Sequence, residues 1–216
     1  MSKKAIILAG SSGIGKAIAN SLKAIKLEVI TTSSSELDTS NLDQVKKFIN
    51  VQKNTDILVL NTGGPPSKNF FDITENDWNK YHSQLFLSFT ILLQKLKINK
   101  GGYIFLISSY NIKEPDPKLI LSNSYRVAFT SVLKSLSASF ANEEISCINI
   151  APGPIKTRRL ESLVSDMKSF EEKLPMKRAG KAEEIGNFVS SIISNNIKYL
   201  TGVTINFDGG KSKFLF

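Results

Sequence analysis

The sequence predicts an α/β fold in which one doubly wound parallel sheet carries helices on both faces, within a single domain covering residues 1–216. Two observations support this. Short apolar segments alternate with longer segments in which Leu and Phe recur three or four residues apart, which is typical of helices that connect parallel strands. The apolar segments are mostly continuous, which indicates strands buried on both faces.

Each strand candidate is rich in Ile and Val and is bounded by Gly, Ser, Asn or Pro. These strands are expected at residues 5–9, 28–32, 57–61, 103–108, 146–150 and 204–206. The helices are expected between them, at residues 15–25, 42–50, 75–97, 122–142 and 183–191.

Composition is that of an ordinary globular chain, with 41% hydrophobic and 22% charged residues. The first apolar run breaks at Gly10, which is too short for a signal peptide or a membrane span, so a cytoplasmic protein without a membrane partner is expected. The net charge of +9 comes from scattered lysines, which favours a solvated surface over a nucleic-acid partner. The lone Cys147 excludes a cysteine metal site, and no metal is expected.

A glycine-rich turn joins the first strand to the first helix. Such a junction lets the backbone approach a diphosphate, and the start of the helix offers free N–H groups, although a plain strand-to-helix turn would also use two glycines. The predicted cofactor-binding residues here are Ala9, Gly10, Ser11, Ser12, Gly13, Ile14 and Gly15.

This turn resembles the G-x-x-x-G-x-G turn of the short-chain dehydrogenase/reductase family, which has a Rossmann-type fold, with Ala9 standing at the first glycine. Further segments resemble that family in its own order along nearly the whole chain. They are Asp38-Thr39, Asn61-Thr62-Gly63, residues 151–157, residues 175–185, and residues 199–202 with 208–210. The chain is short for this family, which implies that the helix and strand normally found after residue 32 are truncated or absent.

The resemblance assigns roles to these segments. It implies that Asp38 and Thr39 hold the adenine edge and that Asn61, Thr62 and Gly63 line the cofactor. The loop after the fifth strand would hold the nicotinamide carboxamide through Pro152, Gly153, Ile155 and Thr157.

The choice between NADP and NAD depends on the end of the second strand. An acidic residue there binds the ribose 2′-hydroxyl of NAD and repels a 2′-phosphate. No carboxylate occurs at that place, residues 31–35, before Glu36, whereas Thr32, Ser33 and Ser34 offer hydroxyl groups to a phosphate. NADP is therefore favoured, with NAD as the alternative.

The expected catalytic residues match the family only in part. Ser109 fits the serine that binds the substrate oxygen, but the tyrosine and lysine expected 13 and 17 residues later are Ser122 and Arg126. The asparagine expected seven residues after Trp78 is Leu85. A serine hydroxyl is a poor proton donor at neutral pH, while Arg126 remains able to hold the cofactor ribose or stabilise an oxyanion. Tyr110 is an alternative proton donor, or it shapes the pocket.

These residues predict an NADP(H)-dependent oxidoreductase that reduces a small-molecule carbonyl or oxidises an alcohol, similar to 3-oxoacyl-carrier-protein reductases but with a non-standard proton donor. The alternative is a catalytically impaired nucleotide-binding sensor or scaffold. The resemblance also implies a homo-oligomer, dimer or tetramer. His82 is interpreted as a surface or interface residue and not as a catalytic one. The side chains left open between core and interface are Phe86, Phe89, Phe129 and Phe140.

Overall fold

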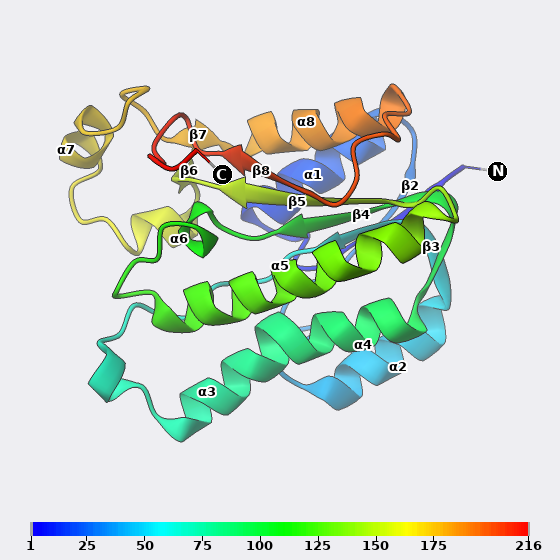
Figure 1. Ribbon diagram of the computed structural model, residues 1–216, viewed down its shortest axis with the longest axis horizontal. Coiled ribbons are helices and arrows are strands. Elements are labelled where there is room, and N and C mark those ends of the chain that lie inside the picture. Colours follow the sequence, from blue (N-terminus) through cyan, green and yellow to red (C-terminus); the bar gives the residue numbers. More distant parts are fainter. Residues whose placement is uncertain (1, 216) are drawn as a thin grey trace.

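A computed structural model describes residues 2–215. Its main sheet holds six parallel strands in the order β2-β1-β3-β4-β5-β8 (Figure 1). The strands are β1 (Lys4–Ile7), β2 (Glu28–Thr31), β3 (Asn54–Leu60), β4 (Lys97–Ile107), β5 (Ser146–Pro152) and β8 (Val203–Phe207). The strand order reverses direction between β1 and β3, which is the point where open α/β sheets bind their ligands. The doubly wound sheet predicted from the sequence is confirmed.

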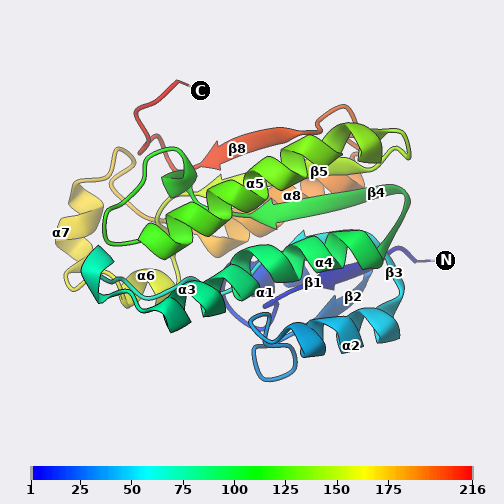
Figure 2. The ribbon, with the colours of Figure 1, turned by 60° about the horizontal axis from the view of Figure 1, so that its bottom comes forward.

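Helices cover both faces of this sheet. One face packs against α1 (Gly13–Ala24) and α8 (Ala182–Ser194). The other face packs against α2 (Leu42–Gln52), α4 (Ser88–Lys95) and α5 (Ile120–Ala141), as Figure 2 shows from below. The helix α3 (Glu75–His82) continues into α4 through a π-helical segment, η2 (Ser83–Leu87).

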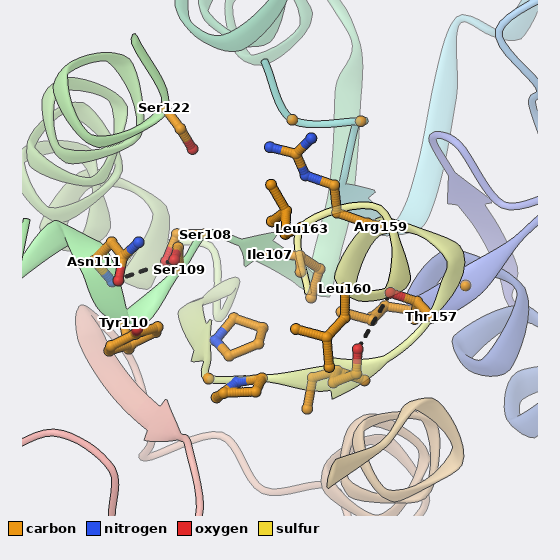
Figure 3. A pocket seen from close by; sticks show the side chains of 18 of the residues that line it. Ile107, Ser108, Ser109, Tyr110, Asn111, Ser122, Thr157, Arg159, Leu160 and Leu163 are labelled. Atoms are coloured by element: carbon orange, nitrogen blue, oxygen red, sulfur yellow. Dashed lines mark hydrogen bonds between the residues drawn. The ribbon is translucent and has the colours of Figure 1, made fainter. Parts of the chain in front are cut away.

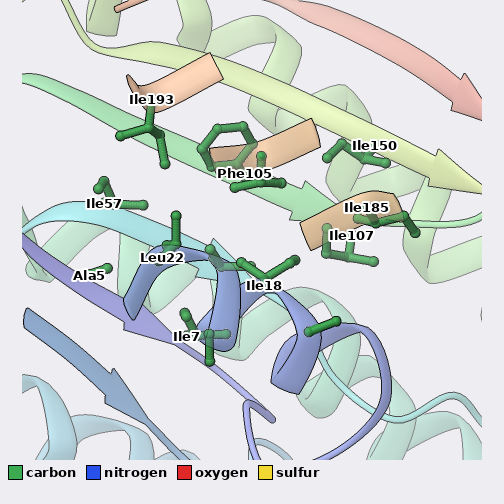
Figure 4. Packing of buried hydrophobic residues seen from close by; sticks show 14 of the residues in the cluster. Ala5, Ile7, Ile18, Leu22, Ile57, Phe105, Ile107, Ile150, Ile185 and Ile193 are labelled. Atoms are coloured by element: carbon green, nitrogen blue, oxygen red, sulfur yellow. The ribbon is translucent and has the colours of Figure 1, made fainter. Parts of the chain in front are cut away.

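Successive side chains of each strand enter opposite hydrophobic cores, which explains the continuous apolar runs in the sequence. Ala5 and Ile7 of β1 face α1 and α8, whereas Ile6 and Leu8 face the other core. Figure 4 shows the first core. There α1 and α8 pack so closely that a Cβ on Gly186 would lie 2.6 Å from the Ala17 carbonyl oxygen.

Several boundaries differ from the sequence prediction. The first strand ends at Ile7 because Ala9 has a φ of +48° and already belongs to the turn. The helix predicted over residues 75–97 is interrupted by η2 and stops at Lys95, since Lys97 begins β4. Residues 32–41 hold only turns between β2 and α2, which agrees with the expected loss of a helix and strand.

The smaller elements gather at the carboxyl ends of the strands. They are η1 (Phe70–Asp72), η3 (Tyr110–Ile112), β6 (Ile155–Lys156), α6 (Arg158–Glu161), α7 (Met167–Glu172) and β7 (Gly180–Lys181). Within residues 2–215, no helix is both long and apolar enough to cross a membrane.

The aromatic side chains on the long helices divide between core and rim. Phe89 and Phe129 are buried in the second core, and Phe86 and Phe140 pack against it while partly exposed. The His82 ring stacks on Phe86 with the ring centres 5.5 Å apart. These contacts give His82 a packing role.

Candidate cofactor and substrate site

A cavity of about 560 Å³ opens at the carboxyl ends of β1, β3, β4 and β5 (Figure 3). The glycine-rich turn, residues 61–64, residues 107–111 and the segment 152–164 line it. Ser122 and Arg126 of α5 complete the wall. The cavity thus lies where the strand order reverses, as the fold predicts for a dinucleotide.

The glycine-rich turn leaves the start of α1 free for an anion. The first-turn N–H groups of α1 have no partner within the helix, Ser12 makes no side-chain cap, and no acidic residue occupies the first turn. Gly13 adopts a φ of +51°, which favours glycine. A Cβ on Gly15 would lie 2.3 Å from the Ala9 carbonyl oxygen. The turn therefore fits a dinucleotide diphosphate.

Two residues predicted to contact the cofactor form hydrogen bonds that support this turn. The hydroxyl of Thr32 accepts a hydrogen bond from the N–H of Ala9 at 3.2 Å, and the carbonyl of Thr32 accepts one from Gly10. The side-chain amide of Asn61 donates to the carbonyls of Leu8 and Ala9. These bonds hold Ala9 in its left-handed conformation, which costs a non-glycine residue about 1–2 kcal/mol.

The turn after β2 holds a carboxylate, Glu36, whose contact with Ser33 was not expected from its position in the sequence. The N–H and hydroxyl of Ser33 both donate to Glu36 at 2.8 Å. These hydrogen bonds lower the pKa of Glu36, so the group is ionised at neutral pH. Of the three hydroxyls predicted to hold a 2′-phosphate, Thr32 and Ser33 are thus engaged within the protein, and Ser34 is exposed.

Asp38 and Thr39 lie outside the cavity lining. The carboxylate of Asp38 accepts hydrogen bonds from the N–H and hydroxyl of Ser40. The buried hydroxyl of Thr39 lies 3.2 Å from that of Thr62, which does line the cavity. Thr39 therefore connects the loop after β2 to the wall of the site, and an adenine contact by these two residues stays a prediction.

The π-helical segment brings Gln84 to the site. Its side-chain amide donates to the Thr62 hydroxyl at 3.1 Å and to the Gly63 carbonyl at 2.8 Å. Leu85, which stands where the family has asparagine, is buried against Tyr81 and Leu121. Gln84 was not predicted because only position 85 was considered for the family's asparagine. The polar residue directly before the apolar Leu85 was the signal that could have found it.

Ser122 and Arg126 form a hydrogen-bonded pair one helical turn apart. The Nε of Arg126 donates to the Ser122 hydroxyl oxygen at 3.1 Å, so the hydroxyl proton of Ser122 is left to donate elsewhere. The Nη1 of Arg126 donates to the Ile107 carbonyl at 2.8 Å, and the Nη2 donates to the Thr62 carbonyl at 3.4 Å. Arg126 therefore bridges the ends of β3 and β4.

Burial lowers the pKa of Arg126 to about 10, with a smaller contribution from the positive charge of Arg159. The guanidinium still carries its charge at neutral pH. A fixed positive charge thus lies behind the Ser122 hydroxyl, in the arrangement that stabilises negative charge developing on a substrate oxygen.

Ser109, Tyr110 and Asn111 form the wall beneath Ser122 (Figure 3). Burial, followed by the charges of Asp116, Glu114 and Asp208, raises the pKa of Tyr110 to about 12. The phenol therefore stays protonated at neutral pH and is a weak acid, which favours its role in shaping the pocket. Asn111 is buried, and its Oδ1 has no hydrogen-bond partner among the described residues.

The opposite wall comes from the loop after β5 and from α6. Ile155 and Thr157 line the cavity, and the methyl group of Thr157 would meet a Cβ on Gly13 at 3.4 Å. Arg159 reaches across and donates to the carbonyl of Pro65. Leu160 lies beside it as apolar lining. Arg159 is a site residue that the sequence argument missed.

Most of the predicted residues are brought together by the fold. The predicted residues that line the cavity are Ala9, Ser12, Gly13, Ile14, Asn61, Thr62, Gly63, Ser109, Tyr110, Ser122, Arg126, Pro152, Gly153, Ile155 and Thr157. Those outside its lining are Gly10, Ser11, Gly15, Thr32, Ser33, Ser34, Asp38 and Thr39.

Comparison with known proteins agrees with this geometry. A family model described as enoyl-(acyl carrier protein) reductase matches residues 35–212. The chain is 29% identical over 237 residues to the 3-oxoacyl-[acyl-carrier-protein] reductase FabG of Buchnera aphidicola subsp. Baizongia pistaciae, covering 96% of each chain. It is 27% identical over 250 residues to the dehydrogenase/reductase SDR family member 4 of Sus scrofa, covering 99% of this chain and 88% of that one. This chain belongs to the short-chain dehydrogenase/reductase family.

A solved structure of the same fold is L-sorbose reductase from Gluconobacter frateurii, complexed with NADPH and L-sorbose. It superimposes with a TM-score of 0.85 at 23% identity, over 99% of this chain and 98% of that one. As a short-chain dehydrogenase/reductase, the chain is an NAD(P)-dependent oxidoreductase. The departures from the family pattern at Leu85, Ser122 and Arg126 stay predictions from residue spacing.

Proposed function

We propose that this short-chain dehydrogenase/reductase reduces a small-molecule carbonyl compound to an alcohol, or runs the reverse oxidation, with a serine and arginine pair in place of the usual tyrosine and lysine. The observation that carries the proposal is the hydrogen bond from Arg126 to Ser122 within the cavity that Ser109 also lines. Together they place hydroxyl donors and a fixed positive charge around one space for a carbonyl oxygen.

The cofactor half of the site supports this reading. The start of α1 would hold the diphosphate, Asn61, Thr62 and Gly63 would lie along the ribose, and Ile155 and Thr157 would flank the nicotinamide. Bound there, the nicotinamide ring would supply or accept the hydride.

The residues of the chain would then act on the substrate oxygen. The hydroxyls of Ser109 and Ser122 donate hydrogen bonds to it, and the charge of Arg126 strengthens the Ser122 donor. Water or the phenol of Tyr110 supplies the proton, and burial makes that phenol a weak acid by raising its pKa to about 12. We expect turnover to be slow compared with a tyrosine-containing site, by roughly 10²–10⁴-fold.

The proposal is tested by following nicotinamide nucleotide oxidation over a panel of carbonyl compounds, after a thermal-shift titration with NADPH and NADH. We expect Ser109→Ala to lower kcat by roughly 10²-fold, as the loss of one oxyanion donor does elsewhere. Ser135→Ala, on the exposed side of α5, is the matched control and should leave kcat unchanged. Nucleotide binding without any oxidation in the wild type would favour a sensor or scaffold, and no binding would contradict both.

We propose that the site accepts both NADP(H) and NAD(H) and that Glu36 sets the ratio between them. The lack of a carboxylate at residues 31–35, where β2 ends, favours NADP, but Glu36 occupies the donors of Ser33 and adds a negative charge beside the place of a 2′-phosphate. Glu36 is fully exposed, so it can move aside at little cost.

Glu36→Gln should therefore tighten NADPH binding by roughly 10-fold, because the change removes a negative charge that repels the 2′-phosphate. The Kd for NADH should stay the same. Fluorescence titration of both nucleotides measures this, with Glu143→Gln, an exposed change of equal charge at the far end of α5, as the control. Equal effects on both nucleotides would refute the role of Glu36.

A further inference from the structure

Two arginines of the site face the same cavity without an acidic partner. Arg126 reaches the Thr62 carbonyl and Arg159 reaches the Pro65 carbonyl, so the two guanidinium groups bracket residues 62–65. Neither forms an ion pair with any residue in the described part of the chain. The Arg126 residue is only 9% exposed. A buried charge without a counter-charge is costly, so an anion bound here would be stabilised strongly.

The arginines also repel one another. The charge of Arg159 contributes to the lowered pKa of Arg126, and burial lowers the pKa of Arg159 itself. Among residues 2–215, only one hydrogen bond, to Pro65, uses the five N–H groups of Arg159. Its remaining donors are therefore free to bind a ligand.

The cofactor diphosphate does not account for Arg159. The start of α1 would hold the diphosphate, and from the opposite wall the methyl group of Thr157 lies 3.4 Å from where a Cβ on Gly13 would stand. Arg159 instead lies against Gly64 and Pro65, on the side of the cavity where Ser122 projects (Figure 3). That side is where the substrate must bind to reach Ser109 and Ser122.

The rest of this part of the cavity suits a hydrocarbon chain. Its apolar lining consists of Leu119, Leu160, Leu163, Val164 and Phe170. Asp116 is the only acidic residue among the described residues that line the cavity, whereas Arg126, Arg158, Arg159 and Lys211 contribute positive charge. The combination favours a molecule with one anionic end and an apolar body.

We propose that Arg159, supported by the charge of Arg126, binds a carboxylate of the substrate, so that the substrate is an oxo acid or the corresponding hydroxy acid. The planar fork of a guanidinium matches a carboxylate through two parallel hydrogen bonds. This inference rests on the proposed carbonyl reduction and names its substrate class. Arg159 is then the residue that makes the enzyme prefer oxo acids to neutral ketones as substrates.

The test compares short 2-oxo, 3-oxo and 4-oxo acids with their methyl esters, which keep the carbonyl and lose the charge. For the wild type, kcat/KM should be at least about 10-fold higher for one acid than for its ester, since a hydrogen bond to a charged group contributes about 1.5–3 kcal/mol. Thermal shift of the cofactor-loaded protein with the same compounds measures binding independently of turnover.

Arg159→Met should raise KM for that acid by roughly 10- to 100-fold and leave the KM of the ester and the Kd of NADPH unchanged. Arg159→Lys should recover part of the loss because the charge returns without the fork. Lys168→Met, which removes an exposed positive charge from α7 outside the cavity lining, is the matched control and should leave the KM of both the acid and the ester unchanged.

Three outcomes would overturn the assignment. The first is a wild type that binds and reduces acids no better than esters. The second is an equal loss for acid and ester in Arg159→Met, with a lower melting temperature, which would make the Pro65 contact structural. The third is a raised Kd for NADPH in Arg159→Met, which would mean that Arg159 binds the cofactor. A wild type that neither binds nor oxidises NADPH or NADH would instead contradict the proposed function itself.

Discussion

Gly15→Ala should abolish measurable binding of NADPH and NADH. The added Cβ would lie 2.3 Å from the Ala9 carbonyl oxygen and 2.8 Å from the side-chain nitrogen of Asn61, so the backbone of the turn must shift. Overpacking of this kind costs about 1–3 kcal/mol, which lowers the melting temperature of a domain of this size by roughly 2–12 °C. Thermal-shift titration of the variant measures both effects.

Gly63→Ala is the matched control for stability. Its added Cβ meets nothing within 4 Å, so its melting temperature without nucleotide should equal that of the wild type. If Gly15→Ala kept the wild-type response to NADPH, the close approach between the start of α1 and the turn would not be needed for binding. The assignment of this turn as the diphosphate site would then be wrong.

Ser122→Tyr combined with Arg126→Lys should raise kcat by about 10²-fold, the low end of what general acid catalysis contributes. Both positions lie on one face of α5 and line the same cavity, which leaves room for a phenol. A lysine beside that phenol lowers its pKa, so the variant gains a group able to transfer a proton at neutral pH. Steady-state kinetics on a carbonyl reduced by the wild type measures the gain.

Ser122→Phe with Arg126→Lys lacks only the new hydroxyl and is the control for this gain. It should stay at or below the wild-type rate. The pH profile offers a second readout, because the tyrosine variant should show an ionisation that the wild type lacks. A double variant slower than the wild type would mean that the serine and arginine pair supports a different mechanism.

Most of the residues proposed to bind the cofactor could be predicted from local sequence. The turn from Ala9 to Gly15 is recognisable because a close backbone approach and a positive φ require small residues at fixed spacing. The loop ending in Thr157 is recognisable for a similar reason, since Pro fixes φ and Gly permits backbone conformations that other residues rarely adopt. Ser109, Ser122 and Arg126 line one cavity, and their correspondence to the family's serine, tyrosine and lysine stays a prediction.

Other parts of the site could not be predicted from the sequence. Thr32 was assigned to a phosphate, yet its hydroxyl is held by the Ala9 N–H. Glu36 was set aside because it follows β2 by several residues, and only the turn brings its carboxylate back to Ser33. Gln84 reaches Thr62 only because a π-helical segment interrupts the long helix.

The sequence by itself determined the order of strands and helices, the two buried faces of the sheet and the glycine-rich turn, because these depend on periodicity and on the backbone freedom of single residues. Only the tertiary structure decided which polar groups are free to bind a ligand. Arg159 and Pro65 meet across 94 residues of sequence, and Thr32 meets Ala9 across 23. The hydrogen bonds between such distant residues form only after the sheet has assembled. No local sequence pattern therefore shows which donors they use and which stay available for a ligand.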